Sequence, residues 1–173
     1  EILNISFEIY IPDRKKEGYG PSIESFKILI ERGVKIIFTV DCGTLSFEAI
    51  DYAAKNNIDV IVLDHHQSEV KLPKAFSIIN PNRLDDTSNL EYLCAAGVTF
   101  MFLVSMNKML RLKEWFVKNK IVEPDLILFL DLVSLGTVCD VVPLIGLNRA
   151  IVKQGLKILK SKKNLGLKTL LDI

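Results

Sequence analysis

Asp59-Val60-Ile61-Val62-Leu63-Asp64-His65-His66 is an apolar run that ends in one acid and two histidines. Four consecutive apolar residues, three of them β-branched, predict a buried strand. Open α/β sheets bind ligands just past the carboxyl ends of their strands, where this acid and these histidines stand. The chain has only these two histidines, and packing does not require adjacent histidines at a strand tip. Divalent metal ions and phosphate groups do use such side chains.

The composition is that of a soluble globular domain with almost no net charge. Of the 173 residues, 49% are hydrophobic and 25% are charged, which suits one domain with its own core. The net charge of +1 neither requires nor excludes a nucleic-acid partner, because a local basic strip can hide in a neutral total. No apolar run reaches the roughly 18 residues of a membrane span, so we expect no membrane partner.

The cysteines and the first residue bear on where the protein works. The three cysteines are far apart and have no zinc-like spacing, which indicates reduced thiols and a cytoplasmic protein. The chain starts at Glu1 and not at a methionine, so we expect a segment of a longer protein.

Strands and helices alternate in the first half of the chain, which favours a parallel sheet covered by helices. Strands are predicted at 7–10, 34–40, 60–63 and 77–80, and helices capped by Ser22 and Ser46 at 22–32 and 46–56. Beyond Pro81, apolar helices are predicted at 93–113, 125–135 and 147–160. We therefore predict a single α/β domain over residues 1–173, with a parallel sheet flanked by helices at 1–92 and a mainly helical part at 93–173.

Three acidic positions share one context. Asp41 and Asp64 each follow an apolar strand, and Asp140 follows a predicted Gly136-Thr137-Val138 turn. If the two strands are parallel neighbours, Asp41 and Asp64 emerge at the same edge of the sheet. Crowded carboxylates repel one another unless a cation neutralises them. Carboxylate oxygen with imidazole nitrogen favours Mn²⁺ or a similar ion over Ca²⁺, and two such ions would clamp the oxygens of a phosphodiester.

Each of these residues also has an ordinary structural interpretation. An acid at a strand end commonly turns the chain or caps a helix, which would account for Asp41 or Asp140 alone. His65 or His66 alone would be a hydrogen-bonded surface histidine. The lysines after position 156 fit a solvated helix end, favoured by the helix dipole. Metal chemistry is favoured by the combination of these residues and not by any one of them.

Several motifs occur in a fixed order along the chain. They are Tyr10-Ile11-Pro12-Asp13-Arg14, Glu17-Gly18-Tyr19-Gly20, Thr39-Val40-Asp41-Cys42-Gly43, Asp64-His65-His66, Ile79-Asn80-Pro81-Asn82-Arg83, Ala95-Ala96-Gly97-Val98 and the segment from Leu135 to Leu144. In this order they resemble the DHH phosphoesterase family, and within it the branch of bacterial single-stranded-DNA exonucleases. The resemblance spans nearly the whole chain.

The resemblance implies a set of metal ligands. Asp41 would bridge two ions, and His65 and Asp140 would bind one of them. The ions would be Mn²⁺ or Mg²⁺, two in the complete enzyme. The family has an earlier motif of paired aspartates, but Asp13 is the only aspartate before Asp41. We therefore expect at most one well-held ion in this chain.

The resemblance also implies the catalytic and substrate-binding residues. Asp64 would act by orienting an imidazole, as carboxylates near metal sites commonly do, and His66 would face the scissile phosphate. Arg14 and Arg83 would bind the phosphate backbone, because a guanidinium matches phosphate geometry.

The implied reaction is metal-dependent hydrolysis of phosphodiester bonds, by an enzyme that degrades single-stranded DNA from the 5′ end in recombination and repair. The resemblance also implies a second domain after this one, and the chain lacks that domain as it lacks the first motif. We therefore expect the segment alone to be inactive and to self-associate through an open sheet edge. Two alternatives stay open: a DHH phosphodiesterase that acts on short or cyclic nucleotides, and a non-catalytic module for nucleic-acid binding or assembly.

Overall fold

The computed structural model describes residues 2–172 and divides them into two compact units. The sheet unit is Ser6–Glu91, and the helical unit holds the described residues from Tyr92 onward with those before Ser6. The expectation of a longer parent protein was based on Glu1. That residue lies outside the described residues. That the whole chain is one domain stays a prediction.

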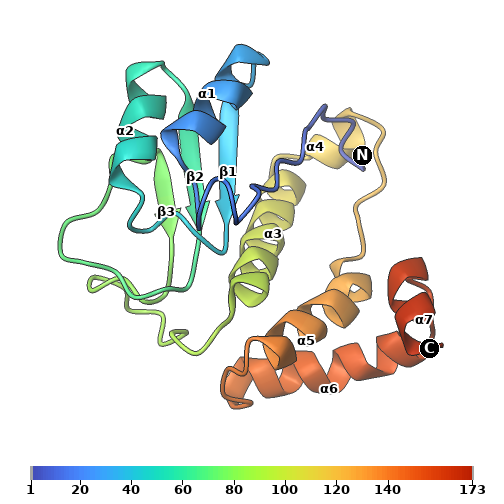
Figure 1. Cartoon of the computed structure of the whole chain (residues 1–173). Helices are drawn as coiled ribbons and strands as arrows, with labels where there is room; N and C mark the ends of the chain where they lie inside the picture. Colours follow the sequence, from blue (N-terminus) through green and yellow to red (C-terminus); the bar gives the residue numbers. More distant parts are fainter. Residues whose placement is uncertain (1, 173) are drawn as a thin grey trace. The chain divides into compact units, whose positions relative to one another are not determined.

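The sheet unit is built on three parallel strands in the order β1, β2, β3 (Figure 1). They are β1 (Ile36–Val40), β2 (Asp59–Leu63) and β3 (Ser77–Ile79), and β2 pairs with both of its neighbours. The helix α2 (Phe47–Lys55) connects β1 to β2, because parallel neighbours need a crossover. The predicted α/β class, a parallel sheet flanked by helices, is confirmed.

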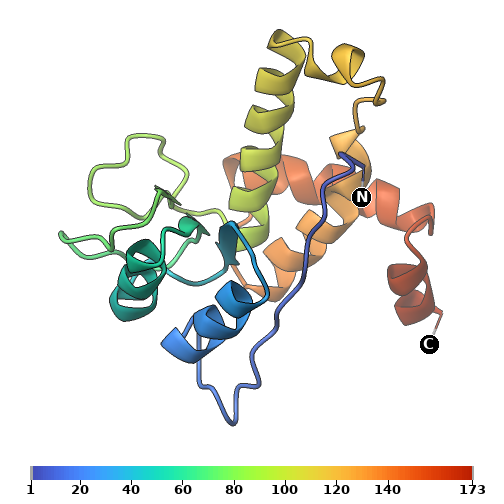
Figure 2. The same ribbon diagram turned by 90° about the horizontal axis from the view of Figure 1, so that it is seen from above.

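Two helices cover one face of this sheet. α1 (Ile23–Glu31) and α2 lie side by side over it in both views (Figures 1 and 2). Alternate residues of each strand point into the layer between sheet and helices, as the pleat requires. The buried residues of this core are Phe26, Leu29, Ile37, Ala49, Ile50, Ala53, Ile58, Val60, Val62 and Ile78.

The ends of these helices follow local signals in the sequence. The Ser22 hydroxyl accepts a hydrogen bond of 3.0 Å from the Ser25 N–H, so the predicted cap of α1 is confirmed. Gly33 follows the end of α1 with a φ of 85°, a conformation that glycine adopts without strain. Ser46 stands at the first position before α2, but its side chain makes no capping hydrogen bond.

β1 is an edge strand within the described sheet, and its residues alternate between exposed and buried. The apolar run at 34–40 predicts a buried strand, but Ile36, Phe38 and Val40 are each about half exposed, so that prediction is wrong for this face. The strand predicted at 7–10 is also wrong. Phe7 and Ile9 are 60% and 73% exposed, and this stretch joins no sheet among the described residues. Alternating side chains favour a strand, but only a backbone partner stabilises it.

The helical unit agrees with the sequence at two of its three predicted helices. Its elements are α3 (Ala95–Leu112), α4 (Trp115–Lys118), the 3₁₀ helix η1 (Leu126–Phe129), α5 (Leu130–Cys139), α6 (Gly146–Lys160) and α7 (Leu165–Leu171). α3 and α6 match the predictions, whereas α4 and α7 were not predicted. The helix predicted at 125–135 is η1 followed by α5, and α5 continues through Gly136-Thr137-Val138. The predicted turn there is wrong, because Thr137 is fully buried and its hydroxyl donates to the Val133 carbonyl inside the helix.

No helix within residues 2–172 combines the length and the apolar character that crossing a membrane would need.

α5 and α6 pack closely because α6 presents a glycine at the contact. The Ser134 hydroxyl donates to the Leu130 carbonyl at 2.6 Å and lies 3.2 Å from the Ile151 carbonyl of α6. A Cβ on Gly155 would lie 1.7 Å from Ser134 Oγ and 2.1 Å from Leu130 O. The contact therefore has no room for any side chain at position 155.

We predict that Gly155→Ala destabilises the chain by about 1–2 kcal/mol. Overpacking a tight contact costs about 1–3 kcal/mol, and a gain of about 1 kcal/mol in helix propensity offsets only part of a severe clash. Gly166→Ala in α7 is the matched control, because its Cβ would meet only Asn164 Oδ1, at 3.5 Å. Urea unfolding followed by circular dichroism measures both changes. Equal stability of the two variants would contradict the packing described for α5 and α6.

Candidate metal centre

The strand register brings two acids to one edge of the sheet. Val40 pairs with Leu63, so Asp41 and Asp64 both stand one residue past a matched pair of strand ends. The Asp41 N–H donates to the Leu63 carbonyl at 2.9 Å, and the Asp64 N–H donates to the Ile79 carbonyl at 3.1 Å. The two acids emerge at the common edge that the sequence predicts for parallel neighbours.

The turn after β1 sets the direction of Asp41. Asp41 has a φ of 63°, in the left-handed region, and its carboxylate is 60% exposed. Gly43 has a φ of 113°, and a Cβ there would lie 2.5 Å from Thr39 Oγ1. Only glycine fits this second position, so the turn holds Asp41 at the open edge of the sheet.

Asp41, His65 and His66 form a group of possible metal ligands. One ligand atom from each lies within 4.8 Å of the other two. His65 Nε2 is 3.2 Å from Asp41 Oδ1, and the centroids of the two imidazole rings are 4.7 Å apart. His65 is largely buried and His66 is half exposed, so the group opens to solvent on one side. One carboxylate and two imidazoles suit Mn²⁺ and similar ions.

Asp64 is outside this group of possible ligands, but its hydrogen bonds hold the two histidines in place. Its carboxylate is buried, with 1% of the residue exposed. Oδ1 accepts hydrogen bonds from the His65 N–H at 2.8 Å and from His66 Nδ1 at 2.7 Å. Oδ2 accepts from the Thr44 N–H at 3.0 Å. A carboxylate on Nδ1 keeps the proton there, which leaves Nε2 of His66 as the ligand or acceptor atom.

The hydrogen bonds also set the charge of Asp64. Burial alone would raise the pKa of this carboxyl group, but hydrogen bonds from His66 and Thr44 outweigh it and lower the pKa from 3.8 to about 2. Asp64 is therefore ionised at neutral pH although it is buried.

Two asparagines after β3 hold the backbone of the histidines, and neither was predicted to belong to the site. The buried Asn80 amide donates to the His66 carbonyl and to Thr44 Oγ1, both at 2.8 Å. The Asn82 amide donates to the His65 carbonyl at 2.6 Å. Their place just past a third parallel strand is the signal that could have identified them, because that strand ends at the same edge.

Tyr19 connects Arg14 to the candidate metal centre. The Tyr19 hydroxyl donates to the Asp41 carbonyl at 2.9 Å and lies 3.4 Å from His66 Nε2. Burial and the negative charge of Asp41 raise the pKa of this hydroxyl, so it remains a donor at neutral pH. The Arg14 guanidinium lies 5.4 Å from the centroid of the Tyr19 ring, a cation–π distance. The predicted phosphate contact of Arg14 stays a prediction.

Arg83 and Asp140 were also predicted to belong to the site. The Arg83 guanidinium contacts the Asp85 carboxylate at 2.6 and 2.9 Å and donates to the Ile78 carbonyl at 2.7 Å. These bonds fix the loop after β3, and a contact of Arg83 with substrate stays a prediction. Asp140 follows the end of α5 in the helical unit, so its convergence with Asp41 and His65 also stays a prediction.

The thiol beside Asp41 is unsuited to nucleophilic chemistry. Burial and the charges of Asp64 and Asp41 raise the pKa of Cys42 to about 11, so it is a neutral thiol at physiological pH. All three cysteines are free, as predicted from their spacing.

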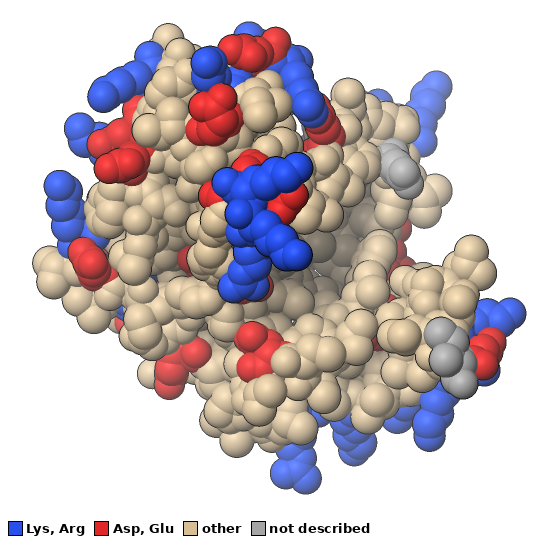
Figure 3. All heavy atoms as spheres, in the orientation of Figure 1, with Lys and Arg blue, Asp and Glu red and all other residues tan. Residues whose placement is uncertain are grey.

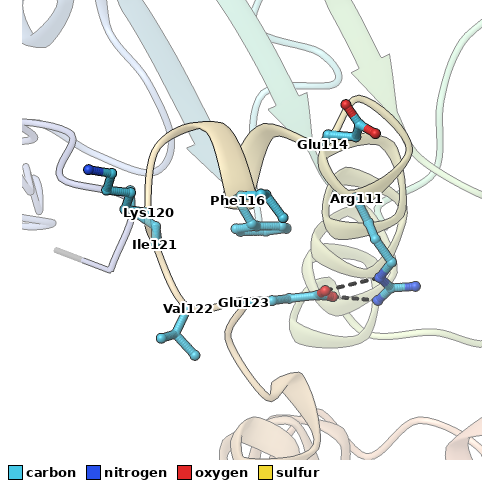
Figure 4. Close-up of a pocket in the computed structure, with 8 residues that line it drawn as sticks. Arg111, Glu114, Phe116, Lys120, Ile121, Val122 and Glu123 are labelled. Atoms are coloured by element: carbon cyan, nitrogen blue, oxygen red, sulfur yellow. Dashed lines mark hydrogen bonds and ion pairs between the residues drawn. The ribbon is translucent and has the colours of Figure 1, made fainter.

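A shallow pocket of about 370 Å³ lies in the helical unit, around α4 and the end of α3. Figure 4 shows Phe116 at its centre and the ion pair of Arg111 with Glu123 along one side. Arg111 Nε donates to Glu123 at 2.9 Å, so these two charges satisfy each other. The pocket has no imidazole or thiol among its lining residues. The strand-end edge is therefore the better candidate for chemistry.

Comparison with known proteins identifies relatives across the chain. The DHH family, N-terminal domain, matches residues 1–137. The single-stranded-DNA-specific exonuclease RecJ of Salmonella typhimurium is 42% identical over 171 residues. This match covers 98% of the chain and 29% of the relative, so the chain spans less than a third of that protein.

Two solved structures with bound manganese are similar in fold. The structure of exonuclease RecJ bound to manganese superposes with a TM-score of 0.75 at 30% identity and covers 94% of the chain and 38% of that protein. The RecJ complex with Mn²⁺ from Thermus thermophilus gives a TM-score of 0.67 at 28% identity and covers 87% and 21%.

We predict that Asp64→Asn destabilises the chain at neutral pH and flattens its response to acid. The lowered pKa means that ionised Asp64 stabilises the fold above pH 3.8, and that this contribution is lost as the pH falls toward about 2. A shift of this size corresponds to about 2 kcal/mol. Urea unfolding at neutral pH and at steps below pH 4 should show a difference between parent and variant that shrinks with acid.

Asp59→Asn is the control for this prediction. Asp59 is exposed and lies at the opposite end of the same strand, β2. If Asp59→Asn and Asp64→Asn give the same pH profile, the hydrogen bonds to Asp64 do not set the acid stability.

Proposed function

The chain belongs to the DHH family, and we propose that it is the metal-binding part of a larger enzyme that hydrolyses single-stranded DNA. The observation that carries this proposal is the group of Asp41, His65 and His66 at the carboxyl edge of a parallel sheet. Ligand atoms of three residues gather there, and the buried Asp64 fixes the histidines. The manganese in the names of the two similar structures supports Mn²⁺ as the ion.

The residues have distinct parts in this proposal. A bound Mn²⁺ or Mg²⁺ would neutralise charge on the phosphoryl group and lower the pKa of a water molecule. Asp41 would hold the ion through its exposed carboxylate and His65 through Nε2, with Asp140 as a further ligand. His66 would contact the scissile phosphate through Nε2, which lies 3.4 Å from the Tyr19 hydroxyl, since its Nδ1 is bonded to Asp64.

We also propose a substrate, a direction of digestion and a cellular role for the reaction. We propose digestion of single-stranded DNA from the 5′ end, in recombination and repair, in the cytoplasm. The name of the relative, a single-stranded-DNA-specific exonuclease, supports the substrate. Arg14, beside Tyr19 at the edge of the centre, is a candidate to bind the phosphate backbone of the DNA. Arg83 is a second candidate, and it would exchange its contact with Asp85 for one with a phosphate.

We further propose that this chain alone is inactive. Two-ion hydrolysis needs more ligands than the three that gather in the described part of the sheet unit. The half-exposed Ile36, Phe38 and Val40 of β1 also support self-association through this strand, which sedimentation equilibrium would detect as a dimer.

Titration with Mn²⁺ in a calorimeter tests the metal ligands. We expect one weak site in the chain, and Asp41→Asn or His65→Ala should weaken it by more than about 10-fold, since even losses outside the ligand shell cost about 10–100-fold. His66→Ala should weaken it less, because its proposed partner is the phosphate. If His66→Ala weakens Mn²⁺ binding more than His65→Ala does, the roles proposed for the two histidines are reversed.

Asp59→Asn serves again as the matched control, because it removes one carboxylate from the far end of β2. Circular dichroism of each variant shows whether the fold is kept. Unchanged Mn²⁺ affinity in both Asp41→Asn and His65→Ala would exclude a metal centre at this edge.

Release of nucleotides from end-labelled single-stranded DNA with Mn²⁺ tests the activity. A protein extended to the length of the relatives should digest long strands, and Asp41→Asn in that protein should abolish digestion. The chain alone should release nothing. Digestion by the chain alone that Asp41→Asn removes would contradict the proposed inactivity. Activity of the extended protein only on dinucleotides or cyclic nucleotides would favour the alternative phosphodiesterase.

A further inference from the structure

The positive charge of the chain is concentrated near its C-terminal end. Residues 144–171 hold seven of the 22 Lys and Arg residues and none of the 21 Asp and Glu residues. The rest of the chain is therefore net negative, although the total is +1. This is a local basic strip inside a neutral total, and its effect on a charged partner depends on where the side chains point.

Four of these cations share one side of α6. Arg149, Lys153, Lys157 and Lys160 are all exposed, and at 100° per residue they fall within an arc of roughly 80°. We call them the α6 basic face. The opposite side of the helix is buried against α5, through Asn148, Ile151, Val152 and Gly155. Packing therefore fixes the helix so that the basic face points to solvent, and Figure 3 shows blue side chains projecting along the edge where α6 lies.

The α6 basic face has no acidic partner. None of its four side chains forms an ion pair within residues 2–172, whereas the nearby Lys162 pairs with Asp172. Two arginines elsewhere in the described chain are neutralised, Arg83 by Asp85 and Arg111 by Glu123. Like charges four residues apart on a helix destabilise it, so this arrangement costs free energy unless an anion binds.

We propose that the α6 basic face binds the phosphate backbone of a nucleic-acid strand. Cations four residues apart on a helix are spaced by roughly 6 Å along its axis, which is comparable with the distance between neighbouring phosphates of an extended strand. Residues 144–171 contain no Phe, Tyr or Trp, so the contact is with the backbone and not with stacked bases. The choice of nucleic acid over an acidic protein rests on the proposed function. The face itself does not depend on it.

This surface would hold the strand through charge alone, without reading its sequence. Binding of this kind is independent of base sequence and weakens steeply with salt, because each contact releases counterions from the strand. Its chemistry is separate from that of Asp41 and His65, the proposed metal ligands.

Fluorescence anisotropy with labelled oligothymidylate at several salt concentrations tests the proposal on the 173-residue chain. Replacing Lys153, Lys157 and Lys160 together by Gln should weaken binding by at least about 10-fold and lower the slope of log Kd against log salt by about 2, since each contact contributes about 0.7. Gln keeps the helix propensity close to that of Lys, and circular dichroism checks the fold.

The matched control removes the same charge from the sheet unit. Lys27, Lys35 and Lys55 are exposed, and their joint replacement by Gln should leave affinity and salt slope near those of the parent. Equal losses in the two triple variants would overturn the proposal, since net charge alone would then explain binding. Binding of labelled polyglutamate but not of oligothymidylate would also overturn it and indicate an acidic protein partner.

Two independent titrations separate this proposal from the proposed function, one with Mn²⁺ and one with oligothymidylate in the presence of EDTA. Asp59→Asn, at the far end of β2 from the proposed ligands, should behave like the parent in both. If the metal titration shows no centre at the sheet edge, loss of DNA binding in the α6 triple variant still supports the basic face. If the metal centre is found but the α6 triple variant binds DNA like the parent, only the basic face is excluded.

Discussion

The carboxylate of Asp64 is buried and ionised, and such a group is tolerated only where hydrogen bonds replace the water it has lost. Its partners come from the turn after β1, through the Thr44 N–H, and from the histidines that follow it in sequence. The bonds that satisfy this charge therefore also fix His65 and His66. Asn80, which follows the third strand, donates hydrogen bonds to Thr44 and to the His66 carbonyl. The residues after all three strands are therefore connected through Asp64 and its partners.

Local patterns in the sequence were sufficient for the three strands of the sheet and for the edge where the acids meet. A β-branched run predicts a strand, and the parallel register then places Asp41 beside Asp64 without knowledge of any side-chain contact. The supporting residues could not be predicted in this way. Asn80 lies 14 residues from its partner His66, and Tyr19 lies 22 residues from Asp41, so both contacts exist only in the folded chain.

The errors also have physical causes. Gly136 suggested a turn, because glycine commonly interrupts helices, but it lies within α5. A Cβ there would meet that of Ala96 in α3 at 2.8 Å, so the glycine serves close packing and not chain reversal. Phe7 and Ile9 have the alternation of a strand without a neighbour to pair with. Both predictions were wrong because each local pattern fits two structures, and the tertiary environment decides between them.

The left-handed backbone at Asp41 restricts how this position can change during evolution. Besides glycine, asparagine and aspartate are the residues most often found at positive φ, because their short side chains bond locally. Glutamate keeps the carboxylate but lacks this tolerance, so the exchange that conserves chemistry conflicts with the turn. A lineage released from selection for activity would drift here toward asparagine or glycine. If Asp41 holds the proposed metal ion, the residue at position 41 would then record loss of that ion while the fold stayed intact.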